Sequence, residues 1–160
     1  MESDFTKPIT LVRWAVTFAW AALIFSLSTH TFRPSFSRGL LAWTLQLLHL
    51  HVSSGTFGLL HAFLRGLAHL TEYAIFALLL YGSPGEKSRG LWRPRRAVFC
   101  IVVATAYSLT DEFHQLFVLG RHASLLDCGL NTIGAALAML VLYTQEQIYL
   151  IRSNVVFSRS

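Results

Sequence analysis

Four apolar stretches, each about the length of a membrane span, constrain the fold of this chain more than any other feature. The first runs from Ile9 to Leu27, and the others are expected at about 59–81, 97–119 and 125–143. A helix needs about 20 apolar residues to cross the roughly 30 Å hydrocarbon core of a bilayer. The first stretch is longer than a signal-peptide core and lacks an Ala-x-Ala-like exit, which indicates an uncleaved anchor. We therefore predict an all-α polytopic membrane protein, a single domain over 1–160 with a bundle of four transmembrane helices.

The composition supports the membrane class and argues against a nucleic-acid partner. Hydrophobic residues make up 54% of the chain and charged residues only 13%. Soluble domains carry about 25% charged residues. The net charge of +5 leaves too few Lys and Arg residues outside the apolar stretches to build a nucleic-acid-binding face. These basic residues are instead typical of the loops that fix membrane topology.

The segment between the first two stretches is predicted to contain a shorter, fifth helix. Pro34 and the Ser and Arg residues around it interrupt the chain, and an apolar helix at about 40–50 follows that is too short to span. We expect this helix to lie in the membrane interface, and whether part of 29–66 re-enters the membrane stays open. Ser53-Ser54-Gly55 predicts a turn before the second span.

The loop at 82–96 sets the predicted orientation. It holds five Lys or Arg residues and a single acid, so the positive-inside rule places it in the cytoplasm. With four spans, both termini of a multi-pass cell-membrane protein are then cytoplasmic as well. The unusual polar residues of all four spans consequently fall in the outer half of the membrane. Their convergence from four separate segments predicts a functional site there.

The centre of this site is predicted between Ser108 and Gly134. A charge at membrane depth costs about 2.5–3.5 kcal/mol on insertion scales, so such residues usually have a partner or a task. Helical steps of three and four place Asp111, Glu112 and Gln115 on one face of the third span, and a similar polar face begins the fourth span. The residues predicted to bind a ligand are Ser28, His69, Glu72, Tyr73, Asp111, Glu112, Gln115, Arg121, Asp127 and Asn131.

The charges of this set do not balance. Four acids stand against one sure cation, Arg121. The excess predicts carboxyl groups that keep a proton, a bound cation, or a cationic group of a ligand. Arg121 is expected to fold back over the acids, where it orients a carboxylate or clamps an anionic group of a ligand. The spacing matches no strong metal motif, and we predict neither a metal nor another cofactor.

Several residues also have a plainer interpretation. Asn131, Gly134 and Ala138, with Gly129 nearby, form a small-residue stripe that favours close helix packing, with Asn131 as a hydrogen bond between helices. For His69 alone, a hydrogen bond between helices is the better interpretation than a catalytic or metal-binding role. The two cysteines, Cys100 and Cys128, fall near opposite ends of their spans, beyond the roughly 7 Å reach of a disulfide, which predicts two free thiols.

The same motifs resemble the VanZ-like family of small integral membrane proteins. An acid-Glu-x-x-Gln, a Gly-Arg after a short gap, a downstream Asp and an Asn-Thr-x-Gly lie in the family's order within 111–134. Ile24-Phe25-Ser26-Leu27-Ser28 and His69-x-x-Glu72-Tyr73 agree with it too. The chain departs from the family at Leu119, where a proline often precedes Gly-Arg. The resemblance implies a cell-envelope protein of a family linked to antibiotic resistance, in particular to teicoplanin.

Two classes of function stay open at this point. In the first, an outer-leaflet polar pocket binds an envelope lipid, a lipid-linked molecule or an amphiphilic drug. In the second, the protein is a small intramembrane enzyme in which Glu112, Asp127 or His69 transfers a proton and Arg121 holds a lipid-linked substrate. A transporter is a weaker third possibility, because four spans are few unless the protein oligomerises. The sequence does not determine the oligomeric state.

Overall fold

A computed structural model describes residues 6–28, 34–84, 92–117 and 123–157 of the chain, and within these ranges the protein is all-helical. The prediction of an all-α fold is therefore confirmed. The helices are α1 (Thr6–Ser28), α2 (Pro34–Leu47), α3 (Ser54–Gly82), α4 (Pro94–Gln115) and α5 (Leu125–Phe157). The turn predicted around Gly120 and Arg121 lies outside the described residues.

Three of the helices are long and apolar enough to cross a membrane. They are the segments Ile9–Ser28 of α1, Ser54–Gly82 of α3 and Leu125–Ser153 of α5. The remaining predicted span, the third at about 97–119, corresponds to α4, which is long enough but carries Arg95 and Arg96 at one end and Asp111 and Glu112 at the other. These charged residues lower its mean hydropathy, so the expected count of four spans is not reached by length and composition alone.

The helix boundaries differ from the expected ones at three places. α2 begins at Pro34 rather than near residue 40, because a proline fits the first turn of a helix, where its missing N–H has no partner to lose. The expected turn at Ser53-Ser54-Gly55 is instead the start of α3: the Ser53 hydroxyl accepts the Thr56 N–H at 3.1 Å and caps the helix. α5 continues past Tyr143 to Phe157.

The bundle exposes large apolar side chains, and its interior combines an apolar core with buried polar residues. Large apolar side chains such as Leu59, Leu125 and Leu126 are 75–82% exposed. The buried polar residues are Thr17, Ser28, Ser83, Ser108, Asp111, Glu112, Gln115, Asp127 and Asn131. Because lipid offers no hydrogen bonds to polar groups, this distribution is the one expected of helices that pack against each other inside a bilayer.

Small residues set the distances between the helices. At Gly134 a Cβ atom would lie 2.2 Å from the backbone oxygen of Leu70, so the backbones of α3 and α5 approach each other there. Ala135 and Ala138 are buried on the same side of α5. The predicted packing role of the stripe is therefore confirmed for these positions. Gly129 does not share it, because it is exposed and a Cβ atom added there would have no neighbour within 4 Å.

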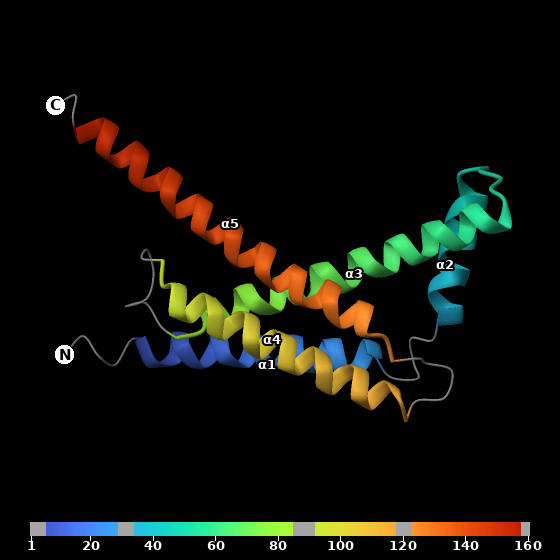
Figure 1. Ribbon diagram of the computed structural model, residues 1–160, viewed down its shortest axis with the longest axis horizontal. Coiled ribbons are helices and arrows are strands. Elements are labelled where there is room, and N and C mark those ends of the chain that lie inside the picture. The colour runs from blue at the N-terminus through green and yellow to red at the C-terminus, as the bar shows by residue number, and fades with distance from the viewer. Residues whose placement is uncertain (1–5, 29–33, 85–91, 118–122, 158–160) are drawn as a thin grey trace.

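The helix arrangement gathers the polar residues at one end of the molecule. Figure 1 shows α1 and α4 side by side, with α3 and α5 crossing over them. The C-terminal ends of α1 and α4, the N-terminal end of α5 and the whole of α2 lie toward the same end. The opposite end is held by a hydrogen bond of 2.7 Å between Thr17 and Ser83 and by stacked rings of Tyr81 and Trp92.

Candidate functional site

A buried hydrogen-bonded triad joins the ends of α1 and α4. The Ser28 hydroxyl donates to Asp111 Oδ2 at 2.6 Å, and Gln115 Nε2 donates to Ser28 Oγ at 2.6 Å. Gln115 Nε2 also lies 3.3 Å from Asp111 Oδ2, one helical turn away on the same face. All three residues are between 3% and 6% exposed. The neutral donors of Ser28 and Gln115 thus take the place of a cation beside Asp111.

Glu112 turns the other way, toward the start of α5. Its Oε2 atom accepts the backbone N–H of Ser124 at 2.6 Å, immediately before α5 begins. The hydroxyl and carbonyl of Ser124 in turn accept the N–H of Asp127. A carboxylate is stabilised at a helix N-terminus by the unpaired N–H groups and by the helix dipole. Glu112 therefore fastens the chain entering α5 to the end of α4.

Two further hydrogen bonds hold α4 and α5 together as antiparallel neighbours. Asn131 Nδ2 donates to the Ser108 hydroxyl at 2.7 Å, and the hydroxyls of Thr105 and Thr132 lie 3.1 Å apart. Asn131 is 1% exposed and Ser108 is fully buried. The prediction that Asn131 forms a hydrogen bond between helices is confirmed. Tyr73 of α3 is fully buried nearby, with its ring 6.4 Å from that of Tyr107.

The cation that sequence reasoning missed is Arg65 of α3. Its guanidinium forms a salt bridge with Asp127, whose side chain is 10% exposed. Arg121, the cation expected in this role, lies outside the described residues, and its predicted contact with the acids stays a prediction. The spacing could have pointed to Arg65, because Arg65, His69 and Glu72 follow each other at helical steps of four and three on one face of α3.

His69 and Glu72 of α3 are less buried than the acids of α4 and Asp127 of α5. His69 is half-buried and close enough to Asp111 for an electrostatic interaction. Glu72 is half-buried as well and lines a hollow between α1 and α3, where Trp20 Nε1 donates to the Glu72 carbonyl at 3.0 Å. Most of the predicted residues that the structure describes thus lie at one end of the bundle. Those that hydrogen-bond or pair there form, together with Ser108, the polar cluster: Ser28, Ser108, Asp111, Glu112, Gln115, Asp127 and Asn131.

Three buried oxygens of the polar cluster lack a hydrogen bond to any described residue. Within the part of the chain that the structure describes, Asp111 Oδ1, Glu112 Oε1 and Asn131 Oδ1 are buried and accept no hydrogen bond. A buried polar atom without a partner costs about 1–3 kcal/mol, and more if it is charged, so native structures rarely leave one unpaired. Tyr73 Oη and His114 Nδ1 are also buried without a hydrogen bond to a described residue, and both lie close enough to Asp111 for an electrostatic interaction. The donors that the three oxygens lack can therefore come from these two side chains or from a bound molecule.

The geometry gives no separate support to metal binding or acid–base chemistry. No group of three His, Cys, Asp or Glu side chains among residues 6–28, 34–84, 92–117 and 123–157 is placed to hold a metal ion. Asp127 pairs with Arg65, and Glu112 accepts the Ser124 N–H with one of its two oxygens. Cys100 and Cys128 are both buried and free, which confirms the prediction of two free thiols.

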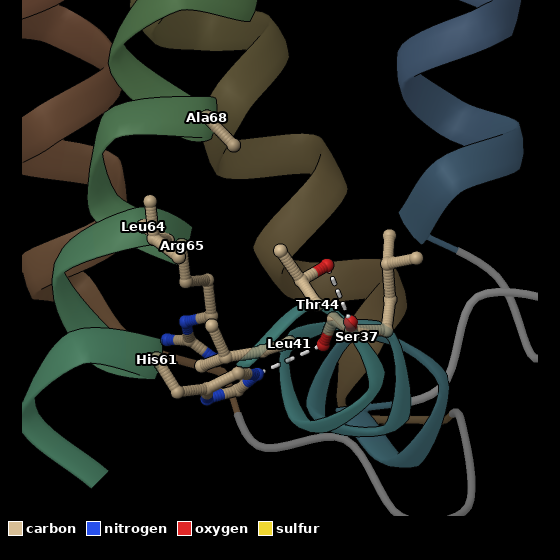
Figure 2. A pocket seen from close by; sticks show the side chains of 8 residues that line it. Ser37, Leu41, Thr44, His61, Leu64, Arg65 and Ala68 are labelled. Atoms are coloured by element: carbon tan, nitrogen blue, oxygen red, sulfur yellow. Dashed lines mark hydrogen bonds between the residues drawn. The ribbon is translucent and has the colours of Figure 1, made fainter. Parts of the chain in front are cut away.

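An apolar pocket of about 350 Å³ opens beside this cluster, between α2 and α3. Figure 2 shows Ser37, Leu41 and Thr44 of α2 facing His61 and Arg65 of α3 across it. A hydrogen bond of 2.9 Å between Ser37 Oγ and His61 Nε2 joins the two walls. Arg65 therefore touches both the polar cluster, through Asp127, and this pocket.

Comparison with known proteins agrees with the motifs. A family model described as VanZ/LLP1 matches residues 13–150, which is most of the chain. The match covers all of α2, α3 and α4 and most of α1 and α5, and it includes every residue of the polar cluster. No curated protein and no solved structure matches the chain.

Proposed function

Because the chain belongs to the VanZ/LLP1 family, we propose that it is a multi-pass cell-membrane protein that binds an envelope lipid or an amphiphilic molecule at the polar cluster. The three unpaired buried oxygens carry the proposal. An amine or hydroxyl group of a bound molecule would supply the missing donors. Lipid-linked envelope molecules and glycopeptide antibiotics such as teicoplanin both carry such groups, and the protein contributes to tolerance of these antibiotics.

The proposed orientation places the polar cluster in the outer half of the membrane. Three Arg residues, Arg93, Arg95 and Arg96, lie at the start of α4, at the end of the bundle opposite to Asp111 and Glu112. The positive-inside rule then supports a cytoplasmic position for that end, and α4 crosses the membrane as a fourth span. A cysteine placed at His122 should be labelled from outside in a Cys-free background, whereas one placed at Ser88 should not. The reverse labelling would overturn the orientation.

Matched amide substitutions test the function itself. The protein is expressed in a susceptible bacterium, and growth in teicoplanin is compared for the wild type, Glu112→Gln and Asp111→Asn. We expect both variants to lose tolerance at equal protein level in the membrane. Glu146→Gln on α5, which lies outside the polar cluster, is the control and should keep it. Tolerance that survives both cluster substitutions would refute the proposal, as would a wild type no more tolerant than the empty host.

A further inference from the structure

The pocket between α2 and α3 is lined mostly by apolar side chains. We call it the interhelical pocket and define it by its lining residues: Ser37, Leu40, Leu41, Thr44, His61, Leu64, Arg65 and Ala68. Its volume of about 350 Å³ falls in the range of small-molecule sites, which begins at roughly 300 Å³. The side chains of Ala68 and of the leucines have no hydrogen-bonding groups for a polar ligand, but they can pack against a hydrocarbon chain.

The charged and titratable side chains of the interhelical pocket are basic. His61 and Arg65 come from one face of α3 at a step of four, and Figure 2 shows their side chains next to each other at the pocket. Arg38 lies close enough to His61 for an electrostatic interaction and stacks over the Phe57 ring at 5.6 Å. Among the described residues, two acids face this group: Asp127 is paired with Arg65, and Glu112 lies close enough to Arg65 for an electrostatic interaction.

The Arg65 guanidinium retains donors for a second anion. Its contact with Asp127 uses Nη2, and its side chain is 41% exposed. A guanidinium carries five N–H groups in a planar fork that matches the oxygens of a phosphate or carboxylate. An anionic group at the pocket can therefore bind Arg65 beside Asp127, with the hydroxyl of Ser37 and the ring of His61 within reach of the same space.

We propose that the interhelical pocket binds an amphiphile with an anionic phosphate head group, whose head contacts Arg65 and whose hydrocarbon chain lies against the leucines of α2 and α3. Charge complementarity selects this occupant, since the lining residues just defined include Arg65 but no acid that could offset a cationic head. The position of the interhelical pocket suits a membrane lipid. Figure 1 shows α2 lying across the end of α3, as a helix at the membrane surface would. The occupancy of the interhelical pocket does not depend on the function proposed for the polar cluster.

Retention of defined lipids on the purified full chain tests this. The protein in neutral detergent is titrated with phosphatidylglycerol or with phosphatidylcholine of the same chains, and bound lipid is counted by native mass spectrometry. We expect the anionic lipid to be retained roughly tenfold or more over the zwitterionic one, and Arg65→Gln to weaken retention roughly tenfold, as the loss of a charge-assisted hydrogen bond predicts. Arg152→Gln, which removes an exposed charge far along α5, should change nothing.

Two further substitutions separate the pocket from general loss of structure. Asp127→Asn frees Arg65 from its carboxylate, so it should raise retention of phosphatidylglycerol, whereas a merely unstable protein would lose lipid. Leu41→Trp fills the apolar part and should lower retention of both lipids. Equal retention of the two lipids by the wild type, an Arg65→Gln variant that behaves as Arg152→Gln does, or lower retention in Asp127→Asn would overturn the proposal. Displacement of phosphatidylglycerol by an equal concentration of inorganic phosphate would also overturn the proposal, because the hydrocarbon chain would then contribute nothing to binding.

Discussion

Replacing Gly134 by alanine is expected to force α3 and α5 apart. The added Cβ would lie 2.2 Å from the Leu70 carbonyl oxygen, 2.9 Å from its carbonyl carbon and 3.0 Å from its Cα. Ordinary contact begins near 3.4 Å, so the two helices must separate by more than 1 Å. All three obstructing atoms belong to the backbone of α3, and no side-chain rotation can relieve the overlap.

The size of the effect follows from two opposing contributions. Overpacking of a tight contact costs about 1–3 kcal/mol, and the rigid backbone neighbours place Gly134→Ala at the upper end of this range. Alanine is favoured over glycine within a helix by about 0.8–1.0 kcal/mol, which offsets part of the cost. The net expectation is a loss of about 2 kcal/mol in the free energy of unfolding. The salt bridge between Arg65 and Asp127 spans the same two helices and should weaken as well.

Gly129→Ala is the matched control for this prediction. It introduces the same methyl group into the same helix, five residues earlier in the chain, where nothing lies within 4 Å. Denaturant unfolding in detergent, followed by tryptophan fluorescence and checked for two-state behaviour, gives both free energies. Gly129→Ala should be neutral or up to about 1 kcal/mol more stable than the wild type. If the two variants unfold at the same denaturant concentration, the close approach of α3 and α5 at Gly134 is wrong.

The Arg65–Asp127 salt bridge, the Asn131–Ser108 hydrogen bond and the two buried cysteines can each be tested by substitution or labelling. In a double-mutant cycle, Arg65→Gln and Asp127→Asn should show a coupling of about 1 kcal/mol or more in unfolding free energy, and strict additivity would contradict the salt bridge. Asn131→Ala removes the N–H that the buried Ser108 hydroxyl accepts, and should lower the free energy of unfolding by about 1–3 kcal/mol. Adding Ser108→Ala should lower it little further. A second loss of the same size would show that the two side chains act separately. Both cysteines are buried, so thiol labelling of Cys100 and Cys128 should be slow in the folded protein and fast after unfolding, and a disulfide found by non-reducing peptide mapping would refute their separation.

The sequence predicts the helix boundaries well where the apolar pattern sets them. It predicts them poorly where helix propensity or a proline sets them. The apolar pattern ends the last span at Tyr143, where the polar run Thr144-Gln145-Glu146-Gln147 begins. Hydropathy measures transfer into lipid, whereas Glu and Gln are good helix formers, so α5 continues beyond the apolar stretch. The start predicted for the short helix, near residue 40, is late for a similar reason, because Pro34 is the first residue of α2 and not a break before it.

The site shows the same division between local and tertiary information. Asp111 and Gln115 are predicted to share a face because one helical turn separates them, and they share a hydrogen bond. Ser28 lies 83 residues before Asp111, and its place beside that carboxylate depends on how α1 packs against α4. Arg65 meets Asp127 because α3 packs closely against α5, as the contact of Gly134 with Leu70 shows. A helical period defines which residues share a face, but it does not define which faces meet.

The charge count from the sequence leaves the excess acids to a retained proton, a bound cation or a cationic group of a ligand. The structure adds neutral hydrogen-bond donors as partners. Asp111 is held by a hydroxyl and an amide, and Glu112 by a backbone N–H at the start of a helix. Asp127 alone among these three forms a salt bridge in the described part of the chain. Neutral donors satisfy one oxygen of each of the other two carboxylates and leave Asp111 Oδ1 and Glu112 Oε1 open. Neutral donors compensate no charge, so Asp111 and Glu112 each keep one open oxygen that a retained proton or a hydrogen-bond donor would satisfy.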